Sequence, residues 1–171
     1  MNTRLSINSK LDLSFTRLVP VKRGLIWRAW TEPELLVKWF CPLPWQTTQC
    51  EIDLYPGGKF ETTMQSPEGQ RISNIGCYLE IDPQKKLIWT NAFSPGFRPK
   101  SQINKTIQSG PNFEFTAIIE LTDSGNQTRY TATVMHSDHE SCQIHTNMGF
   151  EQGWDKALNQ MVEMIQNEML N

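Results

Sequence analysis

The residues best suited to chemistry lie in one short stretch, MHSDHESCQIH. Three histidines and a cysteine recur in it every three residues, at His136, His139, Cys142 and His145. Imidazole nitrogens and thiolates are ligands that zinc prefers. However, a strict period of three drifts around an α-helix, and the stretch should run from a strand end through a connection into a helix start. The four side chains are therefore not expected to converge, and we predict neither a metal site nor a cofactor.

A second candidate group consists of three carboxylates, Glu51, Asp53 and Glu61. Paired carboxyl groups can serve as general acid and general base. Glu51 and Asp53 lie two residues apart in a predicted strand, so they share a face, and the positions that alternate with them are apolar. This pattern favours a solvated outer face over a catalytic pair. The sequence also carries no nucleophile elbow, phosphate-binding loop or zinc-protease helix motif, and we assign no catalytic residue.

Aromatic side chains point to a different kind of site. The chain has six tryptophans among its 171 residues. A large aromatic core would account for them, and so would a pocket with aromatic walls and few polar groups, which is typical of sites for apolar ligands. The aromatic residues around the two short helices predicted below are Trp27, Trp30, Trp39, Phe40 and Trp45.

The elements that would position these residues begin with a strand and two short helices. Residues 11–19 alternate between apolar and polar side chains, which is the period of a half-buried strand, and Pro20 ends it. Residues 21–30 carry apolar side chains at helical spacing. A second helix is predicted to restart directly afterwards, with Thr31 as a candidate N-cap and Pro33 in the first turn.

Strand signals separated by turn signals follow in the middle of the chain. Most connections are short, which predicts antiparallel pairing between consecutive strands. Residues 94–112 instead form a long polar stretch, a length more typical of a lid or a binding loop than of a plain connection. With the first strand, the sheet should have about seven strands. The further predicted strands are residues 48–54, 59–65, 71–81, 86–93, 113–121 and 128–135.

Alternation within these strands also groups side chains by sheet face. It does not indicate which of the two faces is concave. The pairs that should share a face are Phe60 with Met64, Trp89 with Phe93, and Phe113 with Phe115.

The last helix is predicted over residues 143–169, where large apolar side chains form one stripe. Gly149 and Gly153 interrupt its first turns, and each costs about 1 kcal/mol relative to alanine in a helix interior. Four residues apart, the two glycines make a notch on one side of the helix. The notch either lets another segment press against the helix backbone or widens the mouth of a cavity that Met148, Phe150 and Trp154 border.

Composition excludes several classes of partner. The formal net charge is −2 and no segment concentrates lysine or arginine, so we expect no nucleic-acid or membrane partner. No signal-peptide core is visible, and no stretch approaches the roughly 18 apolar residues of a membrane span. We therefore expect a cytoplasmic protein whose four scattered cysteines stay reduced. Length and composition suit one domain over residues 1–171, with residues 1–10 flexible.

Four motifs in order carry a family resemblance: AWTEPELLVKWF, EIDLYPGGKFETTM, GCYLEIDPQKKLIWT and MGFEQGWDKALNQM. The chain resembles the Hsp90-ATPase-activator-like (AHSA1-like) family of the START/Bet v 1 (SRPBCC) superfamily over nearly its whole length. The resemblance implies an α+β helix-grip fold, in which a curved antiparallel sheet surrounds a long C-terminal helix. It also implies a stress-response setting, and it suggests that His136 and His145 position the start of the last helix.

Several functions are compatible with this resemblance, since a fold alone does not settle function. We favour binding of a hydrophobic or aromatic small molecule in a cavity between the sheet and the last helix. One alternative is a cyclase-like or hydrolase-like enzyme in the same cavity, with His136, His145 or Glu61 as its titratable group. Another is a chaperone-interaction module. We expect a monomer or a homodimer. The residues expected to line the cavity are Trp39, Phe60, Met64, Trp89, Phe97, Trp154, Leu158 and Met161.

Overall fold

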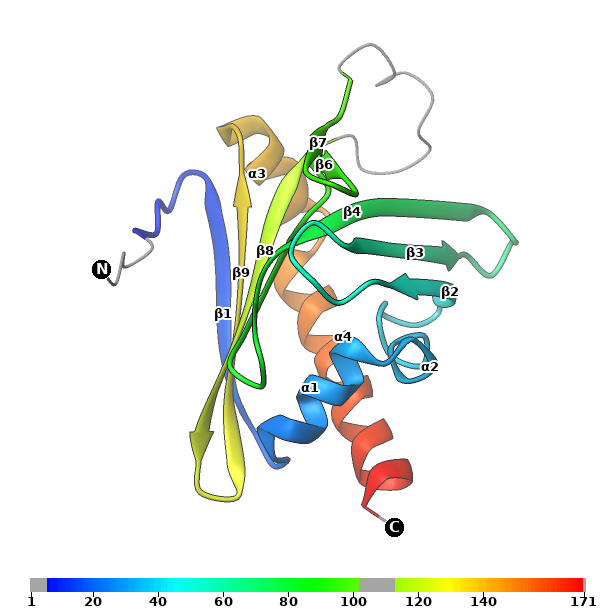
Figure 1. Ribbon diagram of the computed structural model, residues 1–171, viewed down its shortest axis with the longest axis vertical. Coiled ribbons are helices and arrows are strands. Elements are labelled where there is room, and N and C mark those ends of the chain that lie inside the picture. The colour runs from blue at the N-terminus through cyan, green and yellow to red at the C-terminus, as the bar shows by residue number, and fades with distance from the viewer. Residues whose placement is uncertain (1–5, 102–112, 171) are drawn as a thin grey trace.

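A seven-stranded antiparallel sheet forms the frame of the protein (Figure 1). The computed structural model describes residues 6–101 and 113–170. The strands of the sheet are β1 (Asp12–Val19), β2 (Gln46–Ile52), β3 (Lys59–Gln65), β4 (Arg71–Asp82), β5 (Lys86–Thr90), β8 (Phe115–Ser124) and β9 (Gln127–His136). Their order in the sheet is β1-β9-β8-β5-β4-β3-β2. The predicted α+β architecture with about seven antiparallel strands is confirmed.

Helices precede and follow the main run of strands. The helices α1 (Arg23–Thr31) and α2 (Pro33–Leu36) come after β1, as predicted. The helices α3 (His139–Asn147) and α4 (Phe150–Met164) come after β9, and a π-helical turn, η2 (Ile165–Met169), extends α4. None of the described helices is long and apolar enough to cross a membrane.

The predicted last helix is broken at the first of its two glycines. Gly149 has a φ of +83°, a left-handed conformation that residues with a Cβ atom adopt reluctantly, and it forms the N-cap of α4. The preceding helix begins at His139 after the N-cap Asp138, whose carboxylate accepts a hydrogen bond from the backbone N–H of Ser141 at 2.8 Å. The prediction of one helix over residues 143–169 is therefore wrong, because the turn at Gly149 separates α3 from α4.

Strong curvature of the sheet makes room on its inner side. Figure 1 shows β1, β9 and β8 upright, β4, β3 and β2 lying across them, and α4 in the angle between the two groups. The pairing of β4 with β5 shifts register between Tyr78 and Glu80, and such bulges increase local twist. Gly76 in β4 comes so near to β5 that a Cβ atom there would lie 2.0 Å from the carbonyl oxygen of Thr90. Only glycine allows this approach.

Large side chains from the helices fill much of the space inside the sheet. Burial of each contributes about 1.5 to 3 kcal/mol, so the core outweighs the cost of a glycine within α4 several-fold. The indole Nε1 of Trp39 donates a hydrogen bond to the carbonyl oxygen of Ala29 at 3.0 Å, which fixes the segment after α2 to α1. Fully buried side chains from the helices include Ile26, Trp30, Leu36, Met161 and Ile165.

Two predicted segments are described only in part. Residues 1–5 of the predicted flexible terminus lie outside the described residues, while Asn8 N–H donates to the carboxylate of Asp12 at 2.7 Å in a turn. Residues 102–112 of the predicted lid also lie outside. The described start of that region is a small ribbon of β6 (Phe93–Ser94) and β7 (Arg98–Pro99). The predicted strand 86–93 is therefore too long, and Phe93 does not belong to the same sheet as Trp89.

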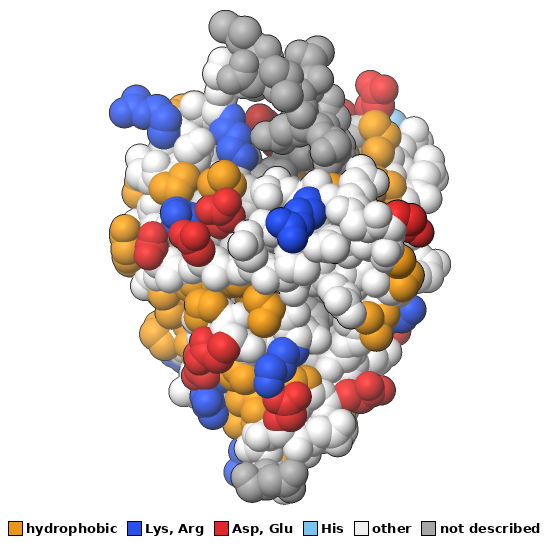
Figure 2. Space-filling model, turned by 90° about the vertical axis from the view of Figure 1, so that its right-hand side faces the viewer, with side chains coloured by type: hydrophobic (Ala, Val, Ile, Leu, Met, Phe, Trp, Pro, Cys, Tyr) orange, Lys and Arg blue, Asp and Glu red, His pale blue; other side chains and the backbone are white. Residues whose placement is uncertain are grey.

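The outer surface carries charges of both signs. On the face shown in Figure 2, acidic and basic side chains are interspersed with hydrophobic ones. Such a mixed face offers no basic stripe of the kind that tracks a nucleic-acid backbone.

Candidate ligand-binding cavity

A cavity of about 290 Å³ lies between α4, the sheet and the segment that follows α2. Its polar lining side chains outside the aromatic set come from Thr62, Asn74, Asn91 and His145. An engineered apolar cavity of about 150 Å³ binds benzene, so this cavity has room for a molecule of two fused rings. Ten of the described residues that line it are aromatic. These are Trp30, Trp39, Phe40, Phe60, Trp89, Phe113, Phe115, Tyr130, Phe150 and Trp154.

The aromatic walls are held by contacts between the rings themselves. Neighbouring rings meet edge to face, with centroids 4.9 Å apart for Trp30 and Trp39 and 4.9 Å apart for Phe60 and Trp89. Such pairs contribute about 0.5 to 1.5 kcal/mol each beyond the area that they bury. Because the rings support one another, the walls are formed before any ligand enters. The continuous series of ring contacts runs through Trp30, Trp39, Phe40, Phe60, Trp89 and Phe115.

The glycine notch of α4 opens into this cavity. Gly149 and Gly153 both line it, and a Cβ atom at Gly153 would meet only the Pro42 side chain, at 3.8 Å. No backbone within residues 6–101 and 113–170 presses against either glycine, so none of these described segments uses the notch for close packing. Met148 also lines the cavity while 58% of its surface is exposed, which places the mouth beside the turn between α3 and α4.

A pair of hydrogen-bonded histidines reaches the cavity wall. His136 Nδ1 lies 2.8 Å from the carbonyl oxygen of Leu11, and His136 Nε2 lies 2.9 Å from His145 Nδ1. His145 lines the cavity, and its ring centroid is 5.0 Å from that of Phe113 and 5.1 Å from that of Phe150. Burial, together with the nearby His136, lowers the pKa of His145 to about 4. The His145 imidazole is therefore neutral at pH 7.

The other members of the histidine and cysteine stretch lie elsewhere. His139 is exposed, and its Nδ1 lies 3.0 Å from the carbonyl oxygen of Lys10. Cys142 is buried, and burial raises the pKa of its thiol. Within residues 6–101 and 113–170, no three histidine, cysteine or acidic side chains are grouped so that they could hold a metal ion.

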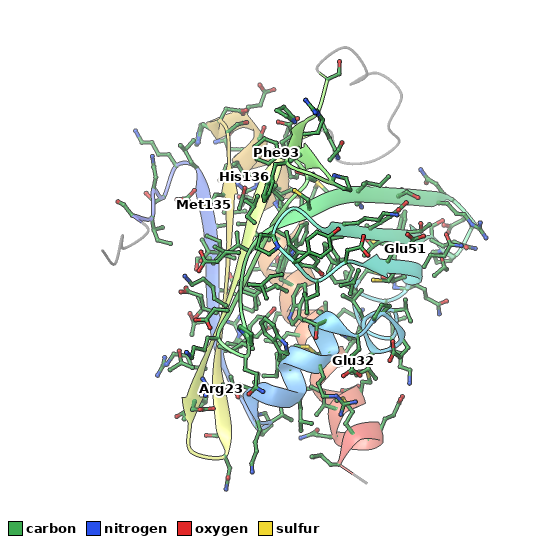
Figure 3. The ribbon with its side chains drawn as sticks, viewed as in Figure 1. Arg23, Glu32, Glu51, Phe93, Met135 and His136 are labelled. Carbon is green, nitrogen blue, oxygen red and sulfur yellow. The ribbon has the colours of Figure 1, made fainter. Side chains whose placement is uncertain are left out.

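The carboxylates form a separate surface cluster. Glu51 and Glu61 face each other across β2 and β3, and Lys59 Nζ lies 2.6 Å from Glu51 and 3.8 Å from Glu61. Figure 3 shows that Glu51 and His136 lie in different parts of the molecule. The carboxylates do not line the cavity, and their position on the outer side agrees with the prediction of a solvated face.

Two indole N–H groups of the walls, those of Trp30 and Trp89, are buried; that of Trp89 has no hydrogen-bond partner in the described part of the chain, and that of Trp30 has only the nearby Tyr130 hydroxyl. Both rings take part in edge-to-face contacts, and aromatic faces are weak acceptors for N–H donors. Because both nitrogen atoms are enclosed in the wall, neither presents a donor to the cavity.

The sequence signature of the Activator of Hsp90 ATPase homolog 1-like protein family matches residues 20–166. The chain belongs to this family. A solved protein from Nitrosomonas europaea is 41% identical, with a TM-score of 0.88 over 96% of this chain and 100% of that one. An AHSA1 protein from Silicibacter pomeroyi shares the fold at 18% identity, with a TM-score of 0.66 over 92% of this chain and 99% of that one. An AHSA1-like protein from Aeromonas hydrophila also shares the fold, at 16% identity and with a TM-score of 0.65 over 94% of this chain and 96% of that one. No curated protein matches the sequence.

In this family member, the structure brings six of the eight predicted lining residues to the cavity. Phe97 is not among them, because it has a positive φ of 59° in the turn between β6 and β7 and its ring lies against Gly57. Met161 is fully buried in the core and does not reach the cavity either. Those that do line it are Trp39, Phe60, Met64, Trp89, Trp154 and Leu158.

The sequence reasoning missed several lining residues of this family member. Phe113 and Phe115 were predicted to share a face, and both line the cavity, but nothing in the alternation assigned that face to the inside. Phe150, by contrast, was predicted to border the cavity mouth, and it does line the cavity. His145 was one of three candidate titratable groups, and only the structure shows that it lines the cavity and is hydrogen-bonded to His136.

Proposed function

We propose that the protein binds a hydrophobic, aromatic small molecule in the cavity. The observation that carries the proposal is the cavity of about 290 Å³ with ten aromatic residues and few polar side chains in its lining. Sites for small apolar molecules usually combine such walls with a small number of polar groups that orient the ligand. The preformed ring contacts favour binding because few side chains have to be ordered when the ligand enters.

Ligand-induced stabilisation tests this proposal. The protein is titrated with naphthalene, indole and anthracene, and thermal unfolding is recorded by circular dichroism. A ligand at 100 times its Kd adds about 2.7 kcal/mol to the free energy of unfolding, which raises Tm by roughly 5 to 10 °C for a chain of this size. Quenching of tryptophan fluorescence provides a second signal, since four of the tryptophans line the cavity. Unchanged melting and unchanged fluorescence with all three compounds would contradict the proposal.

A second candidate function, an enzyme of the cyclase or hydrolase kind, is favoured by one observation. His145 places a titratable side chain in the cavity lining, and a neutral imidazole can act as a general base. The test is prolonged incubation of a bound compound followed by mass spectrometry. Conversion that disappears in His145→Gln while binding persists would support catalysis; a compound recovered unchanged from the wild-type protein after binding would speak for a binding protein.

The cellular setting belongs to the same proposal. All four cysteines are free thiols, which suits a reducing compartment such as the cytoplasm. A labelled form of the protein expressed in its own host and followed by fractionation would test this location.

A further inference from the structure

The hydrogen bonds of the histidine pair determine which polar atom the cavity presents. The carbonyl oxygen of Leu11 can only accept, so His136 Nδ1 carries the hydrogen of that bond. In neutral His136 the Nε2 atom is then an acceptor, and His145 Nδ1 must donate to it. A neutral His145 with a hydrogen on Nδ1 has none on Nε2. The chain of bonds therefore leaves His145 Nε2 with a free lone pair.

The position of His145 directs that lone pair toward the cavity. Its Nδ1 edge faces His136, which comes from the end of β9 (Figure 3) and does not line the cavity. The ring itself lines the cavity beside Phe113 and Phe150. Since His136 occupies the Nδ1 edge, the edge that remains for the cavity is the one that carries Nε2. An acceptor in an apolar space attracts a donor strongly, because water does not compete for it there.

The other polar side chains among the described lining residues impose no such polarity. The Asn91 side chain is already engaged, since its Nδ2 donates to the carbonyl oxygen of Phe113 and its Oδ1 accepts from the N–H of Phe115. Thr62 and Asn74 face each other across β3 and β4, and a hydroxyl or an amide can both donate and accept. His145 is thus the group that discriminates between donors and acceptors on a ligand.

We propose that the cavity selects uncharged aromatic molecules that carry a hydrogen-bond donor, phenols being the simplest class, and that His145 Nε2 accepts this hydrogen bond. The inference rests on the proposed binding function and names its ligand class. His136 is a positioning residue, which holds His145 in the tautomer with a bare Nε2. An aromatic carboxylate is disfavoured, because its anionic oxygens would face a lone pair inside an apolar wall. An aromatic ether fits the walls but leaves Nε2 without a partner.

Four matched probes test the proposal at pH 7.5: 2-naphthol, 2-methoxynaphthalene, naphthalene and 2-naphthoate. Dissociation constants are measured by calorimetry and by fluorescence quenching. We expect 2-naphthol to bind roughly 3-fold to 10-fold more tightly than 2-methoxynaphthalene, the range of one neutral hydrogen bond. We expect 2-naphthoate to bind most weakly. Equal affinities for 2-naphthol and 2-methoxynaphthalene beside measurable binding of naphthalene would overturn the inference and leave the proposed function standing. Absence of binding by all four would overturn both.

Variants separate the two histidines. His145→Leu should abolish the preference for 2-naphthol over 2-methoxynaphthalene, while His139→Gln, an exposed histidine of the same helix, should leave this preference and naphthalene binding unchanged. His136→Gln should reduce the preference for 2-naphthol without weakening naphthalene binding. The tautomer has its own spectroscopic signature, because ¹⁵N chemical shifts distinguish a protonated from a bare imidazole nitrogen. A wild-type spectrum with the His145 hydrogen on Nε2 at pH 7.5 would overturn the proposal even where a variant fails to fold.

Discussion

Gly153 lies in the first turns of α4, lines the cavity and has open space where a side chain would begin. A methyl group there would meet the side chain of Pro42 at 3.8 Å, an ordinary contact. Gly153→Ala should therefore stabilise the protein by about 1 kcal/mol through helix propensity, which raises Tm by about 2 to 4 °C. Gly153→Leu should keep most of this gain, because leucine is also a good helix former.

The leucine side chain should in addition block the cavity. If it keeps about two ligand carbon atoms out of the cavity, the binding free energy becomes less favourable by roughly 1.5 kcal/mol. This loss corresponds to about a tenfold increase in Kd. The prediction is thus a protein that is more stable than the wild type and binds naphthalene about ten times more weakly. Gly153→Ala is the matched control, with the same gain in helix propensity and little intrusion into the cavity.

Thermal unfolding of the three proteins, with and without naphthalene, measures both effects. Lower stability of Gly153→Ala would mean that a neighbouring segment needs the missing side chain, and the packing reasoning would be refuted. Unchanged naphthalene affinity in Gly153→Leu would mean that the ligand lies elsewhere.

Three further predictions concern stability. Gly76→Ala should destabilise the protein by about 3 kcal/mol in urea unfolding, because its Cβ would lie 2.0 Å from the carbonyl oxygen of Thr90; an unchanged midpoint would refute the close approach. Asp138→Ala should lower the urea midpoint, because it removes the N-cap of α3. Hydrogen bonds from Ser141 lower the pKa of Asp138. The stability that the Asp138 carboxylate contributes should therefore be present at pH 7 and fade as the pH falls below the usual range of an aspartate. Folding lowers the pKa of His145 from 6.5 to about 4, so as the pH falls the unfolded chain binds a proton at this site before the folded protein does. The free energy of unfolding should therefore decrease between pH 6.5 and 4, by at most about 3 kcal/mol. His145→Gln should flatten this part of the pH profile, and parallel profiles for the two proteins would contradict the assignment.

Local patterns in the sequence determine the elements and the family. A side-chain period of two predicts the strands, and the placement of Pro20 and Pro33 predicts where β1 ends and α2 begins. The same period put Phe113 and Phe115 on one face, and both line the cavity. These features follow from the sequence because each depends on residues only a few positions apart.

The cavity itself depends on the tertiary structure. Which sheet face is concave follows from the register shift beside Tyr78 and from the close approach at Gly76, and neither changes the alternation of side chains. Met161 continues the apolar stripe of α4 but lies in the core rather than in the cavity. A hydrophobic period cannot distinguish these two surroundings, because both exclude water.

The polarity of the cavity is likewise a long-range property. His136 ends β9 and His145 lies in α3, and only the return of α3 over the sheet brings their ring nitrogens to 2.9 Å. The carbonyl oxygen of Leu11, more than a hundred residues away in the chain, then decides which nitrogen of His145 is bare. The sequence alone determined that histidines were present near the start of the last helical region. Their hydrogen-bonding roles were decided by three segments that meet only in the folded protein, since a tautomer depends on the partners that surround the ring.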